Sequence, residues 1–468
     1  MIVMTLKHIP IDSVSAFRSP RRESSGRRAR GFTIVELLIV IAVIAILASI
    51  IFLGYRGVQN RAVEVSIKSD LQGGVTELER VGVNKQEYPI TSAELNNGSG
   101  FVTSKDVNLT YKRRLASYCL EGSSDRAGSA VFHIDSADPN KILDGPCVLV
   151  VSTLAGSGTS GYANGFRTSA QFKGPHGLAI GSDNTIYVAD HEDHRIRVIS
   201  PSGVVSTLAG TGVAGYSDGP GATAKFRSPM GIAVDKAGNV YVADEANQRI
   251  RKITPGGMVS TLAGSTAGFA DGTGATAQFN YPRGIVMTDN GTLYVSDFNN
   301  DRIRIVSPSG VVSTLAGSSV EGSLDGTGSD AQFNGPWGLS MGPTGDLFVA
   351  DSNNARIRRV TLAGNVTTYA GTVYGFEEGP VSSAKFSSIH DVAVAIDGTV
   401  YVADTLNHRI RKISTAGIVS TYAGTDFVGL IDGDLAAASF GETHGLAVDK
   451  YGGLYVGELY NYVVRKIE

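Results

Sequence analysis

A six-residue segment returns at a nearly constant interval through the C-terminal two thirds of the chain, and this repetition limits the possible folds more than any other feature. It reads Val-Ser-Thr-Leu-Ala-Gly in four copies and is varied in two more, at residues 151–156, 205–210, 259–264, 312–317, 366–371 and 419–424. Successive copies are 53 or 54 residues apart. Such a period indicates an array of one supersecondary unit rather than a conventional single-core domain.

Three further markers recur along the array. They are a strand end similar to Tyr-Val-Ala-Asp, a strand similar to Arg-Ile-Arg and an apolar strand after Pro-x-Gly, found in the first unit at Tyr187–Asp190, Arg195–Arg197 and Gly177–Ile180. Turns rich in Gly and Asn separate the strands. Each unit therefore provides four short strands, as in one blade of a β-propeller, and six units predict six blades.

The ends of the array indicate how the ring closes. The last unit stops at Glu468 without its own hexapeptide, whereas the copy at 151–156 precedes the first complete unit. We expect the N-terminal strand 150–156 to complete the sixth blade, which leaves no open sheet edges there. The unit resembles the NHL repeat, and this resemblance implies a mainly β fold, with a six-bladed NHL-type β-propeller over residues 150–468.

Positions that stay fixed in the six copies are those that each blade needs. We interpret the strand-end Asp, a nearby Asn and the Arg that follows as a turn network of carboxylate, amide and guanidinium groups. One recurring Phe per unit is predicted to pack between blades. These Phe residues are Phe172, Phe226, Phe279, Phe333, Phe386 and Phe440.

One position varies while its surroundings stay fixed, namely the residue just before the Gly that opens the apolar strand. Equivalent positions in six blades should ring one mouth of the central channel, the usual ligand site of a propeller. The predicted ligand ring is His176, Met230, Arg283, Trp337, His390 and His444. Arg283 and the only Trp of the chain, Trp337, would suit an anionic or sugar-like ligand.

Three of these ring positions are His in blades that neighbour one another in a closed ring. Converging imidazoles suit zinc with an open fourth position, so His176, His390 and His444 are candidate metal ligands. At these ring positions the chain is similar to the peptidyl-hydroxyglycine amidating lyase, another NHL-like propeller. In the fifth unit, however, Asp391 stands where Gly is usual after the ring position. The alternative is that the imidazoles are a plain polar lining.

Calcium is a second candidate cation for the propeller. Each unit has a Gly-rich insert, and four of these inserts contain Asp-Gly, beginning at Asp218, Asp271, Asp325 and Asp432. Carboxylate oxygens suit calcium, but Asp-Gly is first of all a turn signal.

The N-terminal region has a different character. Residues 1–30 are polar and basic, and an apolar run of 21 residues follows from Thr33 to Leu53. As a helix this run spans about 31 Å, the thickness of a bilayer core, so a single membrane span is predicted at 33–53. The basic flank keeps the N-terminal side in the cytoplasm and places the rest of the chain outside. Glu36 is the only charge in the run, and an intramembrane carboxylate usually has a function.

The stretch from Gly31 to Leu47 resembles the class III signal of type IV pilins and type II secretion pseudopilins. The resemblance implies that prepilin peptidase removes a basic leader, residues 1–31, by cutting after Gly31. Phe32 then becomes the methylated N-terminus, and Glu36 pairs with the N-terminal amine of a neighbouring subunit during assembly. The alternative is an uncleaved single-pass anchor, which has no need of Glu36.

An amphipathic pattern continues beyond the apolar run and extends the predicted helix to residues 32–80. Its apolar positions are Val58, Ala62, Val65, Ile67, Leu71, Val75 and Leu78. Residues 81–148 are predicted to form a small pilin-like α+β head. Cys119 and Cys147, the only two cysteines, are predicted to form a disulfide outside the cell; the alternative is two separate buried thiols.

Composition narrows the function. A net charge of −3 gives no basic excess for nucleic acid, and no catalytic triad motif or phosphate-binding loop is visible. We predict a minor pilin or pseudopilin of the bacterial cell membrane, whose partners are prepilin peptidase and other pilin subunits. Its extracytoplasmic propeller would bind an unknown protein, peptide or glycan ligand, or mediate adhesion. The alternatives are an extracellular metal-dependent lyase or hydrolase with its site at the channel mouth, and a structural protein with a ligand-free ring.

Overall fold

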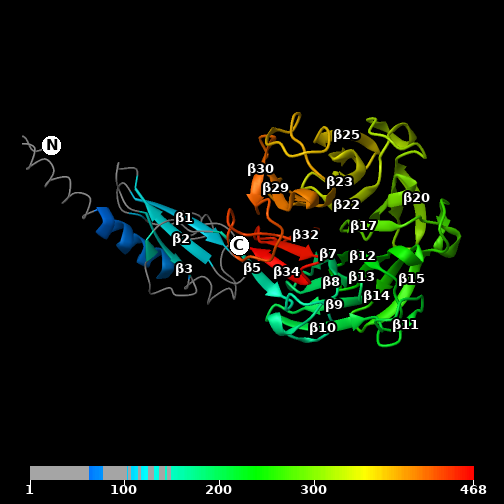
Figure 1. Cartoon of the computed structure of the whole chain (residues 1–468), viewed down its shortest axis with the longest axis horizontal. Helices are drawn as coiled ribbons and strands as arrows, with labels where there is room; N and C mark the ends of the chain where they lie inside the picture. Colours follow the sequence, from blue (N-terminus) through cyan, green and yellow to red (C-terminus); the bar gives the residue numbers. More distant parts are fainter. Residues whose placement is uncertain are drawn as a thin grey trace, which may run out of the picture. The chain divides into compact units, whose positions relative to one another are not determined.

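The computed structural model (Figure 1) describes residues 149–468 and, ahead of them, residues 63–76, 78, 103, 107–113, 118–124, 131–135 and 143–144. The predictions for Gly31, Phe32, Glu36, the span 33–53 and Cys147 fall outside these residues. Within the described part of the chain, no helix is both long and apolar enough to cross a bilayer. The processing site, the membrane span and the Cys119–Cys147 disulfide therefore stay predictions.

A helix and an antiparallel sheet precede the propeller. Residues 63–76 are helical, and the sheet has the order β1 (Asn108–Arg113), β2 (Tyr118–Ser123), β3 (Phe132–Asp135), β4 (Leu143–Asp144). Ile67 and Leu71 are fully buried and lie against Gly122 of β2. The interpretation of Val65 as part of the apolar stripe is wrong. Its side chain is 68% exposed, because a residue two positions from Ile67 lies on the opposite side of the helix.

Six antiparallel sheets around a central channel form the propeller, which confirms the predicted mainly β, six-bladed fold (Figure 1). Each sheet has four main strands, and the first of them lines the channel while the fourth lies farthest from it. A fifth strand of two residues, which the repeat pattern did not predict, comes from the Gly-rich insert and pairs with the outermost main strand. Such a short strand shows no alternation of apolar and polar residues, so only its pairing reveals it.

The first three blades follow one another along the chain. Blade 1 has β7 (Pro175–Ile180), β8 (Ile186–Asp190), β9 (Arg195–Ile199), β10 (Val204–Ala209) and β6 (Gly165–Phe166). Blade 2 has β12 (Pro229–Val234), β13 (Val240–Asp244), β14 (Arg249–Ile253), β15 (Met258–Gly264) and β11 (Gly219–Pro220). Blade 3 has β17 (Pro282–Met287), β18 (Leu293–Asp297), β19 (Arg302–Val306), β20 (Val311–Ala316) and β16 (Gly272–Thr273).

The remaining blades complete the ring. Blade 4 has β22 (Pro336–Met341), β23 (Leu347–Asp351), β24 (Arg356–Val360), β25 (Asn365–Ala370) and β21 (Gly326–Thr327). Blade 5 has β27 (Ile389–Val394), β28 (Val400–Asp404), β29 (Arg409–Ile413), β30 (Ile418–Ala423) and β26 (Gly379–Pro380). Blade 6 has β32 (Thr443–Val448), β33 (Leu454–Glu458), β34 (Val463–Ile467), β5 (Val150–Ala155) and β31 (Gly433–Asp434). Short 3-10 helices lie in the connections: η3 (Arg167–Ser169), η4 (Glu245–Asn247), η5 (Gly274–Thr276), η6 (Phe298–Asn300), η7 (Gly328–Asp330), η8 (Ser352–Asn354) and η9 (Thr405–Asn407).

The sixth blade joins the two ends of the propeller. Strand β5 pairs antiparallel with β34, with Val151 opposite Ile467 and Ala155 opposite Val464. The backbone of Val150 also exchanges hydrogen bonds with that of Glu468. The first strand of the propeller therefore holds the last blade, and the paired edges of β5 and β34 are not available for other strands.

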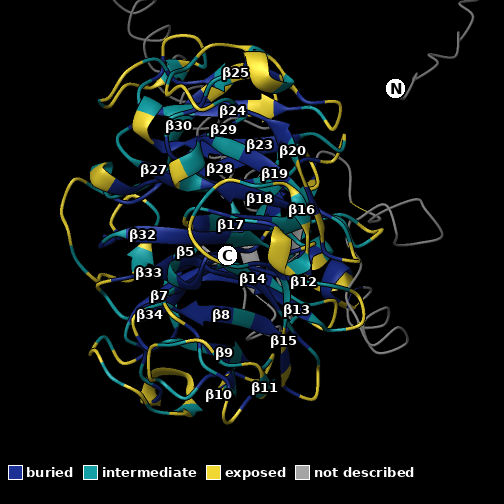
Figure 2. Ribbon diagram, turned by 90° about the vertical axis from the view of Figure 1, so that its right-hand side faces the viewer, coloured by how far each residue is buried: buried dark blue, intermediate teal, exposed yellow. Residues whose placement is uncertain are grey.

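Buried residues lie mainly on the strands of the blades and exposed residues on the connections (Figure 2), and the hydrophobic core is divided into layers between neighbouring blades. One layer combines Ala189 and Ile196 of blade 1 with Phe226, Ile232 and Val242, which belong to the second unit. All six recurring Phe residues are fully buried, which confirms their predicted packing role. Because each layer needs side chains from two blades, an isolated blade could not bury its apolar faces.

A buried ion pair stabilises every blade. The second Arg of the Arg-Ile-Arg strand donates to the strand-end carboxylate at 2.6–3.2 Å, and each of these guanidinium groups is fully buried. In blade 2, Asn247 also donates to the Asp244 carboxylate at 2.8 Å. The predicted network of carboxylate, amide and guanidinium is thereby confirmed in five blades, whereas blade 1 has Asp193 in place of the Asn; the structural role follows from the ion pair, which is present in all six blades.

The same guanidinium groups explain the Asp residues of the Asp-Gly inserts. Asp218, Asp271, Asp325 and Asp432 accept from the Nη2 atoms of Arg251, Arg304, Arg358 and Arg465 at 2.6–2.7 Å. These carboxylates are therefore occupied by an internal cation. This observation favours the structural interpretation of the inserts over calcium binding.

Candidate functional site

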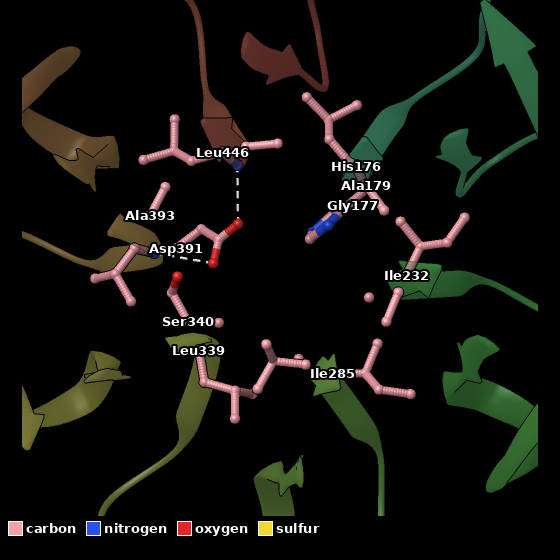
Figure 3. Close-up of a pocket in the computed structure, with 18 of the residues that line it drawn as sticks. His176, Gly177, Ala179, Ile232, Ile285, Leu339, Ser340, Asp391, Ala393 and Leu446 are labelled. Atoms are coloured by element: carbon pink, nitrogen blue, oxygen red, sulfur yellow. Dashed lines mark hydrogen bonds between the residues drawn. The ribbon is translucent and has the colours of Figure 1, made fainter. Parts of the chain in front are cut away.

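The central channel is a cavity of about 270 Å³ lined by the six innermost strands, β7, β12, β17, β22, β27 and β32 (Figure 3). Along its length the walls are mainly aliphatic, with Leu178, Ile232, Ile285, Leu339 and Leu446 among the lining residues. Polar groups concentrate at the end where these strands begin. The cavity thus combines aliphatic lining residues, which are themselves mostly buried between the blades, with a substantial polar surface.

The glycine of the Pro-x-Gly frame sets how closely the inner strands approach one another. A Cβ on Gly177 would lie 2.2 Å from the carbonyl oxygen of Met230, and one on Gly231 would lie 2.2 Å from that of Arg283. Only glycine leaves room for this approach of neighbouring strands. The preceding residue is thereby held in an equivalent place at the start of each inner strand.

Five of the six predicted ring residues line the cavity, and four of them form an aromatic cluster. The imidazole of His444 lies between its neighbours, with ring centroids 4.6 Å from His176 and 4.3 Å from His390. Trp337 stacks on His390 at 4.0 Å with an angle of 17° between the ring planes. Met230 is buried but does not line the cavity. The cluster fills one end of the channel, since all three imidazoles are at least nine-tenths buried.

Arg283 is held beside this cluster by two aromatic rings and one carboxylate. Its guanidinium carbon lies 3.5 Å from the centre of the Phe298 ring and 3.8 Å from that of Trp337. Its Nε donates to Oε1 of Glu245, in η4, at 2.8 Å. The positive charge is therefore paired within the protein, which leaves no excess charge here to bind an anion.

Two of the imidazoles belong to a hydrogen-bonded chain that begins at a carboxylate. Oε2 of Glu442 lies 3.3 Å from Nε2 of His444, and Nδ1 of His444 lies 2.8 Å from Nε2 of His176. The repeat comparison did not reveal Glu442, which precedes the ring position by two residues in the sixth unit only. The chain connects a partly exposed carboxylate to an imidazole that faces the cavity, an arrangement that orients imidazoles for proton transfer.

Burial controls the ionisation of this cluster. It lowers the pKa of His176 and of His390 well below the usual value, with smaller contributions from neighbouring imidazoles and Arg283. Burial also lowers the pKa of His444, against which hydrogen bonding to Glu442 acts. His176 and His390 are therefore neutral near pH 7, each with one nitrogen that accepts and one that donates.

The arrangement does not form a zinc site. Nδ1 of His444 and Nε2 of His176 point at each other rather than at a common centre. Within the described residues, no three His, Cys, Asp or Glu side chains are placed to hold a metal ion together. What the cluster does offer is hydrogen bonding, because Nε1 of Trp337, Nη1 of Arg283 and Nδ1 of His390 are buried without a partner among these residues.

Asp391 places a carboxylate inside the channel beyond the cluster (Figure 3). Its oxygens accept hydrogen bonds from the backbone N–H of Val392 at 2.9 Å and of Leu446 at 2.8 Å. Burial raises the pKa of this carboxyl to about 7, although both hydrogen bonds act in the opposite direction. Asp391 is thus a titratable group near neutral pH within a largely aliphatic cavity.

Comparison with protein families agrees with this architecture. Segments 172–199, 226–253, 279–306, 333–360 and 386–413 match the NHL repeat, and residues 26–52 match the prokaryotic N-terminal methylation motif. This chain is an NHL-repeat propeller with an N-terminal methylation motif. The sixth blade lies outside the matched segments, and its strand end reads Tyr-Val-Gly-Glu instead of Tyr-Val-Ala-Asp.

Similar proteins cover the propeller. The SUPPRESSOR OF QUENCHING 1 protein of Arabidopsis thaliana is 29% identical over 64% of this chain, which spans 31% of that protein. A Bacteroides thetaiotaomicron protein of unknown function is 21% identical with a TM-score of 0.55, covering 79% of this chain and 92% of its own. An auxiliary nutrient binding protein of the same organism is 17% identical with a TM-score of 0.55, covering 75% and 83%. At these identities, the solved structures show a common fold.

Proposed function

We propose that the protein is a minor pilin-like subunit that displays its NHL propeller outside a bacterial cell, where the central channel binds a small ligand. The observation that carries the proposal is the presence in one chain of the methylation motif at 26–52 and the propeller at 150–468. The motif provides the substrate of prepilin peptidase and the assembly helix. A propeller of this size favours a rare or terminal position, since filament subunits pack closely.

The channel supports the ligand-binding half of the proposal. Its end carries aromatic surfaces from Trp337, His176 and His390 and buried polar atoms without partners, and its interior is aliphatic. A buried N–H without an acceptor costs about 1–3 kcal/mol, which a ligand that supplies the acceptor would recover.

Replacing Glu36 by Ala should abolish incorporation into the pilus or pseudopilus, because a subunit N-terminus would lose its partner carboxylate. Cleavage after Gly31 should continue, so that the mature chain still begins at methylated Phe32. Mass spectrometry of the N-terminus and immunoblots of sheared filaments measure the two steps. Glu64→Ala, which changes the same residue type in the helix beyond the apolar run, is the matched control and should assemble normally. Normal assembly of Glu36→Ala would contradict the proposal.

The Glu442–His444–His176 chain favours a second candidate function, an extracellular lyase or hydrolase in which His176 acts as the general base. Glu442→Gln should lower the pKa of His444 further, because the carboxylate stabilises its protonated form. Titration of the imidazole signals by NMR measures this shift, with Glu377→Gln on a distant surface as the control. An unchanged His444 titration would show that the carboxylate does not act on the imidazoles and would remove this candidate.

A further inference from the structure

We propose that the channel binds a small organic amine through an ion pair between its ammonium group and Asp391. The inference deepens the proposed function and rests on it only in taking the channel as the ligand site. Four features of the described residues carry it: the exceptional residue at position 391, the absence of a cationic partner, the aliphatic walls and the charge around the far opening.

The first feature is a substitution within the repeat itself. The position of Asp391 is Gly in the other five blades, as Gly177, Gly231, Gly284, Gly338 and Gly445. Glycine is needed there because the next inner strand comes close, as the added Cβ distances of 1.8–2.4 Å in four of those blades show. In blade 5 the carboxylate itself fills the space beside Gly338, whose added Cβ would lie 2.0 Å from an Asp391 oxygen. The other five blades therefore form without a carboxylate at this position.

The second feature is that nothing in the described structure neutralises the charge. Asp391 accepts two backbone N–H groups, and it forms no ion pair with any described Lys, Arg or His. The six strand-end carboxylates, which are fully buried, differ from Asp391, since each is paired with an Arg. A carboxylate that faces the channel and is held by hydrogen bonds but not by a cation provides a site for a cationic ligand.

The third feature is the chemistry of the walls, which selects the kind of cation. Leu339 and Leu446 lie on the two strands next to that of Asp391, and Ile232 and Ile285 line the opposite side of the channel (Figure 3). Ser340, on the neighbouring strand β22, also points into the channel and adds one hydroxyl oxygen. Calcium needs six to eight oxygen ligands, which this set does not provide. An ammonium group on a hydrocarbon body matches both the lone carboxylate and the walls.

The fourth feature is the opening opposite the aromatic cluster. The inner strands end there at partly exposed aliphatic residues such as Ile180, Val234 and Met287. The six turns that follow contain six Asp and two Lys, and Arg359 of β24 pairs with Asp346, which leaves a net formal charge of −3. These residues are Asp183, Asp235, Asp289, Asp346, Asp397 and Asp449, with Lys236 and Lys450. A ring of this sign attracts cations toward the channel and repels anions.

Other titratable groups face the same cavity, but they change their charge in a different pH range from Asp391. His176, His390 and His444 line the opposite end, and burial keeps the pKa of each below its usual value. Arg283 is paired with Glu245. Asp391 is thus the group of the channel interior that ionises around neutral pH. Amine binding should therefore strengthen as the pH rises through about 7.

The test uses the full chain in a nonionic detergent and three probes. Benzylammonium, benzyl alcohol and benzoate all contain a phenyl ring and differ in the charge of the group attached to it. Calorimetry measures affinity, and the fluorescence of Trp337, the only Trp, reports occupancy of the cavity that it lines. We expect benzylammonium to bind saturably and about ten- to a hundredfold more tightly than benzyl alcohol, the usual worth of a charged hydrogen bond. Benzoate should not bind, and benzylammonium should bind at least about tenfold more weakly at pH 5.5 than at pH 8.5.

Asp391→Gly supplies a variant that the other blades already contain, so folding is expected to survive. It should lose the preference for benzylammonium over benzyl alcohol together with its pH dependence. Asp330→Gly, an exposed position on η7, makes the same change elsewhere and should bind as the unaltered protein does. Equal affinity for the amine and the alcohol, or full amine affinity in Asp391→Gly, would overturn the inference. Amine binding is measured on purified protein, whereas display of the propeller is measured in cells. A failure of the amine proposal is therefore distinguishable from a failure of the proposed surface display.

Discussion

Replacing Arg304 by Met should lower the free energy of unfolding by about 3–5 kcal/mol, the usual loss when one partner of a buried ion pair is removed. The guanidinium is fully buried and donates to Asp297 and Asp271, each at 2.6 Å, and to the carbonyl oxygens of Gln278 and Ala270. Met keeps an unbranched apolar stem but no donor. The Asp297 carboxylate, also fully buried, would then keep only its hydrogen bonds from Asn300 and the Asn280 backbone.

The control for this experiment lies two residues away on the same strand. Arg302 is partly exposed, and its guanidinium donates to a single carbonyl, that of Asn300, at 2.7 Å. Arg302→Met should therefore cost less than about 1 kcal/mol, as surface changes usually do. Denaturant unfolding of both variants measures the difference. Equal losses would show that the buried ion pair does not distinguish the two arginines of the Arg-Ile-Arg strand.

The repeats made most of the propeller predictable. Six copies of one unit act as an internal alignment, so the number of blades, the buried Phe layer and the carboxylate–amide–guanidinium network could all be inferred from periodicity. The alignment alone does not distinguish the two arginines of each strand. Arg302 and Arg304 both recur and lie on the same face of β19, and only their depth along the strand places Arg302 at its partly exposed end and Arg304 in the core.

The channel was less predictable, for two physical reasons. The varying position could be found by comparison, but the direction of each side chain depends on its neighbours, so Met230 turns out to be buried away from the cavity. Residues that act in one blade only carry no periodic signal. Glu442 belongs to this class and becomes recognisable only through its hydrogen bond to His444.

Asp391 shows a third limit of sequence reasoning. Its departure from Gly is visible in the alignment, but as an anomaly without a meaning. The proposed role becomes apparent only in the structure, where the carboxylate faces the channel between Leu339 and Leu446 of the neighbouring strands and forms no ion pair with a described residue. Polar groups of the channel such as Asp391 and Glu442 thus occur in one blade only, whereas the ion-paired groups that stabilise the blades recur in every unit. This contrast separates candidates for function from structural residues in a protein built from copies.

The free energy of unfolding of Asp391→Gly, measured relative to that of the unaltered chain, should rise between acidic pH and pH 8. The Asp391 pKa is about 7 in the folded state and near 3.8 in the unfolded chain. A raised carboxyl pKa contributes stability that is fully present below the unfolded value and is lost as the pH rises through the folded value. The full loss is about 4 kcal/mol, and about 2 kcal/mol of it falls between pH 5.5 and pH 8.

The comparison isolates the carboxyl because other effects of the substitution do not depend on pH. Removing Asp391 also removes the acceptor of two backbone N–H groups and adds the chain entropy of a glycine, but these contributions are the same at both pH values. Asp190 and Asp351, whose pKa values burial raises to about 6, are unchanged in the variant and cancel. Denaturant unfolding at pH 5.5 and pH 8 measures the effect, with Asp330→Gly as the control that should show no pH trend. If the stability difference between Asp391→Gly and the unaltered chain stayed constant with pH, Asp391 would have to be ionised throughout, with a cation of the protein beside it.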